Sequence, residues 1–246
     1  MYIKSATFNS VFPKILNLRK RAIEIEDQLS PHFSSINVLP IPDEAPEVIP
    51  RLTTTSHNGH SILEISMTNA QITTEYDTAF MHDPSKCLDY IYKRVFQVTQ
   101  VLESYMVDKS FFSGLKLQVY FDEFDGKAIE LIKEKFLNYK SNKDPHDIEY
   151  KITYALNNTH YANFTFSNAR VYEGVIPTGI STPIMSELEE TSHMLSLSLD
   201  VNNRYAFNHI KEYRSDSRQV EEIFSITRDI IENKVQKIIM EGVIEL

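Results

Sequence analysis

The sequence predicts an α+β fold, in which mostly antiparallel sheet packs against long amphipathic helices. Two similar subdomains are compatible with this class. Three observations predict it. Strand-like runs are grouped, as at 148–173, rather than alternating singly with helices. Apolar residues recur at helical spacing over about 84–106 and 217–240. The 246 residues are 42% hydrophobic and 24% charged, which is typical of a globular protein with a sizeable core.

The first periodic segment, residues 13–29, is expected to be a helix, because Pro13 suits a first turn and apolar residues follow at helical spacing. Residues 31–50 contain five prolines, which remove backbone donors and fix φ. We therefore expect an extended connector, lying on its own domain or in a groove of a partner. Residues 52–67 predict a hairpin, because Asn58-Gly59 offers the two positive-φ residues of a type I′ turn.

Residues 70–77 are expected to form another strand, and a long helix follows. Asp83-Pro84 is typical of a helix start, with an N-cap and a proline in the first turn. Apolar residues continue at helical spacing through about residue 106. An alternating strand at 115–121 and a shorter helix at about 127–139 come next.

The best internal boundary is the polar stretch 141–147. It divides the chain into an N-terminal α+β subdomain, 1–140, and a strand-rich C-terminal subdomain, 147–246. The halves share a loose plan of strands followed by helices, without a residue-level repeat. In the second half we expect strands at 148–156, 161–173 and 192–201, a loop at 174–183 and a terminal helix at about 217–240.

The composition limits the classes of function. A net charge of −9 argues against general nucleic-acid binding, which depends on Lys and Arg. Apolar runs are too short for a membrane span, and the N-terminus lacks the pattern of a secretory signal. The single cysteine, Cys87, excludes an intrachain disulfide framework and is expected in the core. These features favour a cytoplasmic protein.

The common catalytic and cofactor motifs are absent. The six glycines are scattered, and neither a dinucleotide-binding G-x-G-x-x-G nor a P-loop occurs. There is no G-x-S-x-G elbow and no H-E-x-x-H. The sequence therefore favours a protein without catalytic activity or bound cofactor.

Two histidines flank the predicted turn. Pairing across a two-residue turn would set His57 opposite His60, with Cβ atoms roughly 5 Å apart. That could supply two metal ligands, but zinc sites need three or four. We favour two exposed turn-flanking histidines over a metal site.

One constellation suggests an alternative, a metal-dependent nuclease. Glu149 and Lys151 form an E-x-K on a strand, after the strand-end aspartates Asp122 and Asp125. Carboxylates on neighbouring strands would hold Mg²⁺, and the lysine would help to orient the attacking water. The simpler interpretation is that alternation places Glu149 and Lys151 on the polar face of a half-buried strand.

Asp200 and Asn202 are further candidates, because they stand at the end of the strand predicted over 192–201. Aspartate and asparagine there could bind a cation or a phosphate. They are also the residues expected where a strand stops and turns, which is the interpretation we favour.

The order of elements resembles a sporadically distributed family of uncharacterised bacterial proteins. The matching residues are Asp83-Pro84 with the helix after it, and LSLDVNN at 197–203 with the helix from Ser217. This pattern-level resemblance spans about residues 35–240. It implies no established activity, but a tendency to occur near mobile-element, toxin–antitoxin or phage-defence genes.

The sequence as a whole predicts a non-catalytic protein-binding module, an accessory or antitoxin-like component of a bacterial defence or mobile-element operon. The expected partner is another protein, and the acidic charge favours a basic one. Oligomerisation is compatible with the sequence, and membrane binding is not expected. The alternative is the Mg²⁺-dependent nuclease built on Asp122, Glu149 and Lys151.

Overall fold

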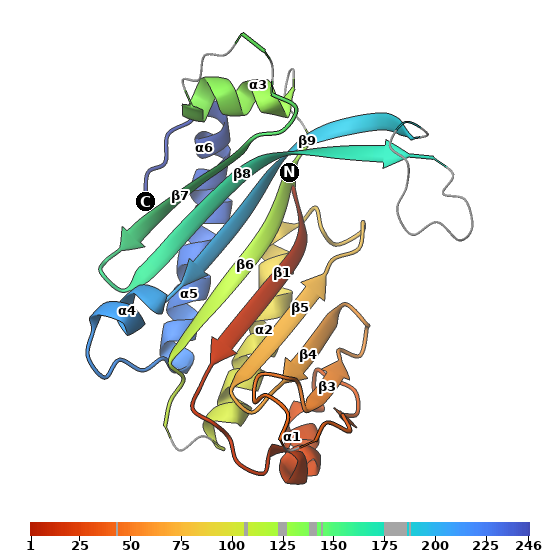
Figure 1. Cartoon of the computed structure of the whole chain (residues 1–246), viewed down its shortest axis with the longest axis vertical. Coiled ribbons are helices and arrows are strands. Elements are labelled where there is room, and N and C mark those ends of the chain that lie inside the picture. The colour runs from red at the N-terminus through yellow and green to blue at the C-terminus, as the bar shows by residue number, and fades with distance from the viewer. Residues whose placement is uncertain are drawn as a thin grey trace.

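A computed structural model describes residues 1–42, 44–105, 108–122, 127–137, 142–143, 145–174, 186 and 188–246. In these residues the main feature is one nine-stranded antiparallel sheet with helices across one face (Figure 1). The strand order is β2-β3-β4-β5-β1-β6-β9-β8-β7. The strands are β1 (Tyr2–Val11), β2 (Asn37–Val38), β3 (Leu52–Thr55), β4 (Ser61–Ile65), β5 (Asn69–Glu75), β6 (Phe112–Phe121), β7 (Glu149–Leu156), β8 (His160–Glu173) and β9 (Glu189–Asn202).

The helical segments are mostly short. They are the 3₁₀ turn η1 (Leu18–Arg21), α1 (Ala22–Leu29), α2 (Pro84–Glu103), α3 (Ala128–Ile132), the π turn η2 (Lys133–Leu137), α4 (Arg204–His209), α5 (Ser217–Asp229), the π turn η4 (Ile230–Lys234) and α6 (Val235–Glu241). Among these described segments none is long and apolar enough to span a membrane.

The predicted fold class, long amphipathic helices packed on sheet with room for two similar subdomains, is wrong. Among the described helices only α2, with 20 residues, exceeds the 13 residues of α5. The helix expected over 217–240 is divided by the π turn η4, and the helix expected over 13–29 begins only after Asn17, whose φ of 57° is left-handed. The strands form one continuous sheet, because residues 2–11, for which no strand was predicted, become its central strand.

The same order of pairing occurs on both sides of the sheet centre. In the first half of the chain β1 pairs with β5, which is followed by β4 and β3. In the second half β6 pairs with β9, which is followed by β8 and β7. The antiparallel pairing of β1 with β6 joins the halves within one sheet. Two positions of the predicted boundary at 141–147, 141 and 144, and positions 175–183 of the predicted loop lie outside the described residues.

Burial alternates along the strands, so the sheet has one apolar and one polar face. On β6, Leu115, Leu117 and Val119 are buried, whereas Lys116 and Gln118 between them point to the other face. Helices α2 and α5 pack on the apolar face, behind the sheet in the view of Figure 1. The core of the molecule therefore lies between these helices and the sheet.

Local signals position the helices. The helix start predicted at Asp83-Pro84 is confirmed, because the Asp83 carboxylate accepts a hydrogen bond of 3.0 Å from the Lys86 amide at the first turn of α2. Helix α5 begins with a capping box, in which Asp216 and Gln219 satisfy each other's backbone donors.

The turn between β3 and β4 differs from the expectation. Between β3 and β4, the Ser56 amide donates to the Ser61 carbonyl at 2.8 Å, which leaves a four-residue loop, and of the Asn58-Gly59 pair only Gly59 has a positive φ. The left-handed pair lies instead at Asn157 and Asn158, with φ of 49° and 53°, where β7 turns into β8.

The proline-rich connector is held by a buried arginine. Arg51 is 1% exposed, and its guanidinium donates to the carbonyls of Ile49 (2.8 Å) and Ala45 (2.9 Å), with longer contacts to Pro42 and Pro46. Prolines have no N–H, so this segment offers more acceptors than donors. A guanidinium, which only donates, complements such a segment.

We expect Arg51→Met to lower the free energy of unfolding by about 2–4 kcal/mol, because the connector carbonyls would lose their donors while remaining partly buried. Arg51→Lys should also destabilise, since an ammonium cannot reproduce the planar fork. Urea denaturation followed by circular dichroism measures both.

The matched control is Arg218→Met, at a side chain that is 82% exposed, which should change stability by less than about 0.5 kcal/mol. Equal stability of Arg51→Met and the parent protein would contradict this role of Arg51.

Candidate binding surface

The polar face of the sheet is called the open face below; α2 and α5 lie on the opposite face, and α4 packs on one end of the open face through Tyr205 and Phe207, which contact Tyr161 and Phe112. Strand register aligns its side chains in rows that cross the sheet. One row crosses eight strands and consists of Thr153, Asn163, Asp200, Lys116, Thr7, Thr73, Ile62 and Thr55. Hydroxyl and amide groups predominate, so this face offers many hydrogen-bonding groups and few charges.

Asp200 and Asn202 lie on the open face, inside β9 and at its last residue. The Asp200 carboxylate accepts hydrogen bonds from the amides of Asn202, at 3.0 and 3.1 Å, and Asn163, at 3.1 Å. The side-chain Oδ1 of Asn202 accepts a hydrogen bond from the backbone amide of Arg204 as the chain enters α4. Asn202 thus has the strand-ending role expected of its residue type, and Asp200 belongs to a cross-strand cluster of hydrogen bonds.

Strands β8 and β9 project beyond the sheet. The last pair between β6 and β9 is Phe121–Leu195, and the last between β7 and β8 is Glu149–Ser167. Beyond these pairs, residues 168–173 and 189–194 form a two-stranded ribbon, here called the arm (Figure 1). An isolated two-stranded ribbon is marginally stable in water, so the arm depends on its side-chain contacts.

At the base of the arm, aromatic and methionine side chains line a pocket of about 470 Å³, called the aromatic pocket below. Register sets Tyr2 beside Tyr120, and the two rings are 5.5 Å apart at their centroids. The Tyr2 hydroxyl lies 3.1 Å from the Met194 sulfur. Lys4 and Asp77, both exposed, provide charges of opposite sign at the lining.

The Tyr2 hydroxyl remains a neutral hydrogen-bond donor over the physiological range. Burial, with smaller contributions from the Asp122 carboxylate and from Tyr120, raises the pKa of Tyr2 above its usual value. Tyr2 therefore offers an apolar ring with a donor at its tip, a combination that is common at protein interfaces.

The structure does not bring the predicted nuclease residues together. Asp122 follows β6 and lies 3.4 Å from the Met1 amino nitrogen, whereas Glu149 and Lys151 stand exposed on the edge strand β7. Strands β9 and β8 separate β6 from β7, which amounts to three strand spacings, or about 14 Å. Asp125 lies outside the described residues. Among the residues that are described, no group of three or more His, Cys, Asp or Glu could hold a metal ion.

The two histidines of the β3–β4 turn contact different neighbours. His57 Nε2 lies 2.8 Å from the Ser30 carbonyl oxygen, close to the end of α1. His60 lies 3.6 Å from the Asp77 carboxylate and contacts the rings of Phe80 and Tyr90. The four-residue turn explains this divergence, because the expected two-residue turn would have set the rings side by side.

Sequence reasoning missed the aromatic pocket. Tyr2, Tyr120 and Met194 are far apart in the chain, and only the pairing of β1, β6 and β9 brings them together. Alternation in 115–121 could have placed Tyr120 on the polar face, where an aromatic residue is unexpected.

Comparisons with known proteins yield no family model that matches the chain and no significant match among curated proteins. The resemblance to a bacterial family therefore stays a prediction.

Cys87 lies in α2 and is fully buried, as predicted. Burial, with a smaller effect of the Asp83 carboxylate, raises the pKa of its thiol to about 12, so at pH 8 only about one thiol in ten thousand is ionised.

We expect the Cys87 thiol of the native protein to resist Ellman's reagent at pH 8, whereas the denatured protein should react fully at one thiol per chain. Rapid labelling of the native protein would contradict this assignment.

Proposed function

We propose that this chain is a non-catalytic binding module that captures a protein partner on its open face, with the aromatic pocket as the anchor point. The observation that carries this proposal is that Tyr2, Tyr120 and Met194, each only half-buried, line one pocket on a mostly polar sheet face. A polar sheet face can remain in contact with solvent without a binding partner. A cluster of aromatic and methionine side chains in one pocket is unusual on such a face and indicates a binding site.

The chemistry of the pocket suits a protein ligand. Tyrosine and methionine are enriched at protein interfaces, and anchor residues cluster in pockets that are surrounded by polar contacts. Methionine adapts to different shapes, and Lys4 and Asp77 can fix the orientation of a partner side chain. The rows of hydroxyl and amide groups around the pocket would form the hydrogen-bonding rim.

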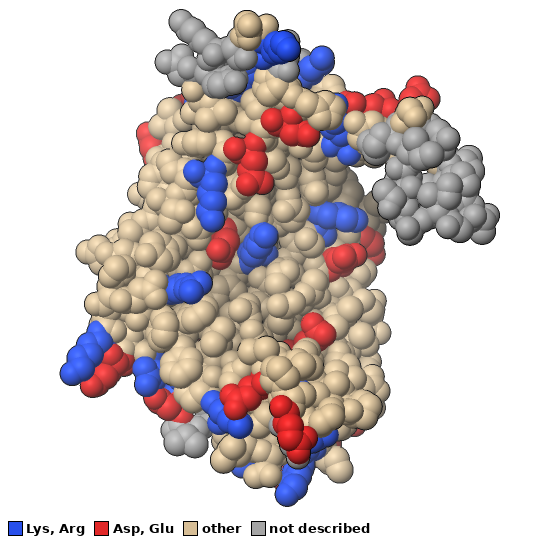
Figure 2. Space-filling model, in the orientation of Figure 1, with Lys and Arg blue, Asp and Glu red and all other residues tan. Residues whose placement is uncertain are grey.

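Charge on the open face argues against nucleic acid as the ligand. Figure 2, in the orientation of Figure 1, shows Lys and Arg scattered among Asp and Glu, with large uncharged areas between them. Along the strands, Lys116 lies opposite Asp200, and Lys151 is two residues from Glu149. A phosphate backbone would require a continuous basic stripe, and these cations are each accompanied by an acid.

The proposed partner is a basic protein, in keeping with the net charge of −9. The arm carries Glu173 and Glu189 at its outer end, which would attract such a partner by long-range electrostatics. In the cell this module would act in the cytoplasm as the accessory or antitoxin-like component of a defence or mobile-element operon.

The test compares the double variant Tyr120→Ala, Met194→Ala with the parent protein. A partner would first be identified by copurification with the tagged full chain, and its affinity then measured by calorimetry with both proteins purified. Because truncating an anchor residue costs more than about 1 kcal/mol, the double variant should bind at least about tenfold more weakly.

The control is Met240→Ala, at a methionine that is 59% exposed on α6, which should leave the affinity unchanged. Unchanged affinity of the double variant, with its thermal unfolding also unchanged, would refute the open face as the binding surface.

A further inference from the structure

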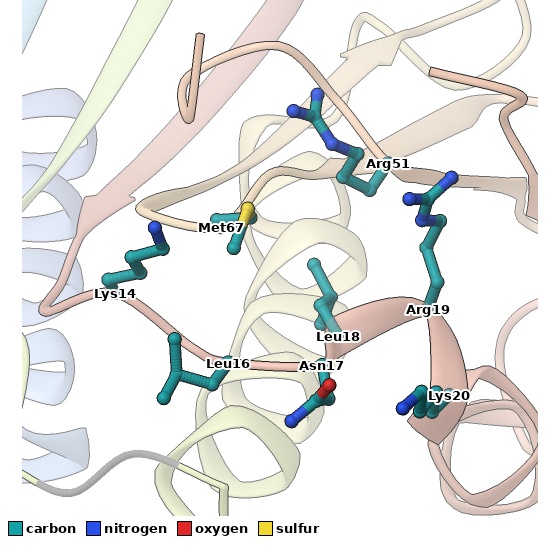
Figure 3. A pocket seen from close by; sticks show the side chains of 8 residues that line it. All are labelled: Lys14, Leu16, Asn17, Leu18, Arg19, Lys20, Arg51 and Met67. Carbon is teal, nitrogen blue, oxygen red and sulfur yellow. The ribbon is translucent and has the colours of Figure 1, made fainter. Parts of the chain in front are cut away.

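A second pocket, of about 320 Å³, lies beyond the ends of β1 and β4 (Figure 3). Residues between β1 and α1 form much of its wall, and Met67 comes from the turn between β4 and β5. Leu18 and Met67 provide apolar lining, and Figure 3 shows Lys14 on one side of them, with Arg19 and Lys20 on the other. Arg51, which also holds the proline-rich connector, lines the pocket as well.

All four charged residues that line this pocket are cations, although the chain as a whole is acidic. Glu47 compensates Lys14, with an Oε1–Nζ distance of 2.6 Å. The Arg19 guanidinium donates to the Ile41 carbonyl at 2.8 Å. The Lys20 ammonium is exposed and makes no ion pair or hydrogen bond with the described residues. Lys20 therefore adds a positive charge that no acid among the described residues compensates.

Arg51 adds a positive charge that solvent screens poorly. Its guanidinium is buried and bonds only to backbone carbonyls, with no carboxylate within 4.0 Å among the residues described. Its Nε is buried as well and has no hydrogen-bond partner. Carbonyl dipoles offset a buried charge only in part, so the positive potential extends into the adjoining pocket.

We propose that this pocket binds a small organic phosphate, whose phosphoryl oxygens contact the Lys20 ammonium group while its apolar part rests on Leu18 and Met67. Cationic groups beside an apolar lining suit an anion that carries a ring or an aliphatic chain better than an inorganic ion. The pocket is separate from the open face, so this inference does not depend on the function proposed above.

The probes are phenyl phosphate, inorganic phosphate and phenol, titrated into the ¹⁵N-labelled full chain up to about 20 mM. We expect saturable shifts of the amide signals of residues 16–20 and 67. Phenyl phosphate should bind about tenfold more tightly than inorganic phosphate, because its ring covers the apolar lining. Phenol, which lacks the charge, should bind most weakly.

Lys20→Ala should weaken phenyl phosphate binding about fivefold, and Lys20→Glu more than about tenfold, since an exposed ion pair contributes up to about a factor of five and its reversal adds repulsion. Both variants should fold, because Lys20 is exposed. Lys211→Ala, at a side chain that is 93% exposed and paired with Glu212, is the matched control and should leave phenyl phosphate binding unchanged.

Three results would overturn the proposal. They are the absence of saturable shifts at these amides, binding that survives Lys20→Glu, and equal affinity for phenyl phosphate and inorganic phosphate. The last result would remove the assigned role of Leu18 and Met67 and leave a general attraction for anions.

Discussion

The antiparallel pairing of β1 with β6 is the interaction on which the rest of the structure depends. It joins residues about 110 positions apart, such as Ala6 and Leu117, and turns two sets of locally paired strands into one sheet. It also sets Tyr2 beside Tyr120 and so creates the aromatic pocket. Because loop closure over such a separation is costly in entropy, this pairing should form after the local hairpins, and the binding surface would be completed with it.

Because α2 and α5 pack on one face of the sheet, that face is apolar and the opposite face is polar. Alternation sends Leu115, Leu117 and Val119 towards α2 and α5, and leaves Lys116 and Gln118 in water. The aromatic pocket and the cation-lined pocket lie at different ends of this construction. The first depends on contacts between distant strands, and the second on a short loop and the connector that Arg51 anchors.

Local signals in the sequence predicted local structure well. The start of α2 at Asp83-Pro84 and the β3–β4 hairpin depend on neighbouring residues, and both are present. The central strand β1 was not predicted, because a register shift between Ile3 and Ser5 disrupts its alternation. The turns show the limit of local signals: Asn58-Gly59 and Asn157-Asn158 could each supply two consecutive left-handed residues, but only Asn157-Asn158 does so. Neither pocket could be predicted, because Tyr2 and Met194, like Lys20 and Met67, meet only through the path of the whole chain.

The proline-rich connector affects whether two copies of this protein can associate through the edges of their sheets. It contains β2, the outermost strand on one side of the sheet, which pairs with β3, and its Leu39 amide is already paired with the Arg51 carbonyl. Prolines at 40, 42, 46 and 50 leave few free N–H groups along this border, so a strand from a neighbouring molecule would find little to pair with. The connector thereby disfavours edge-to-edge pairing of sheets at this border, and with it the growth of a fibre from this side.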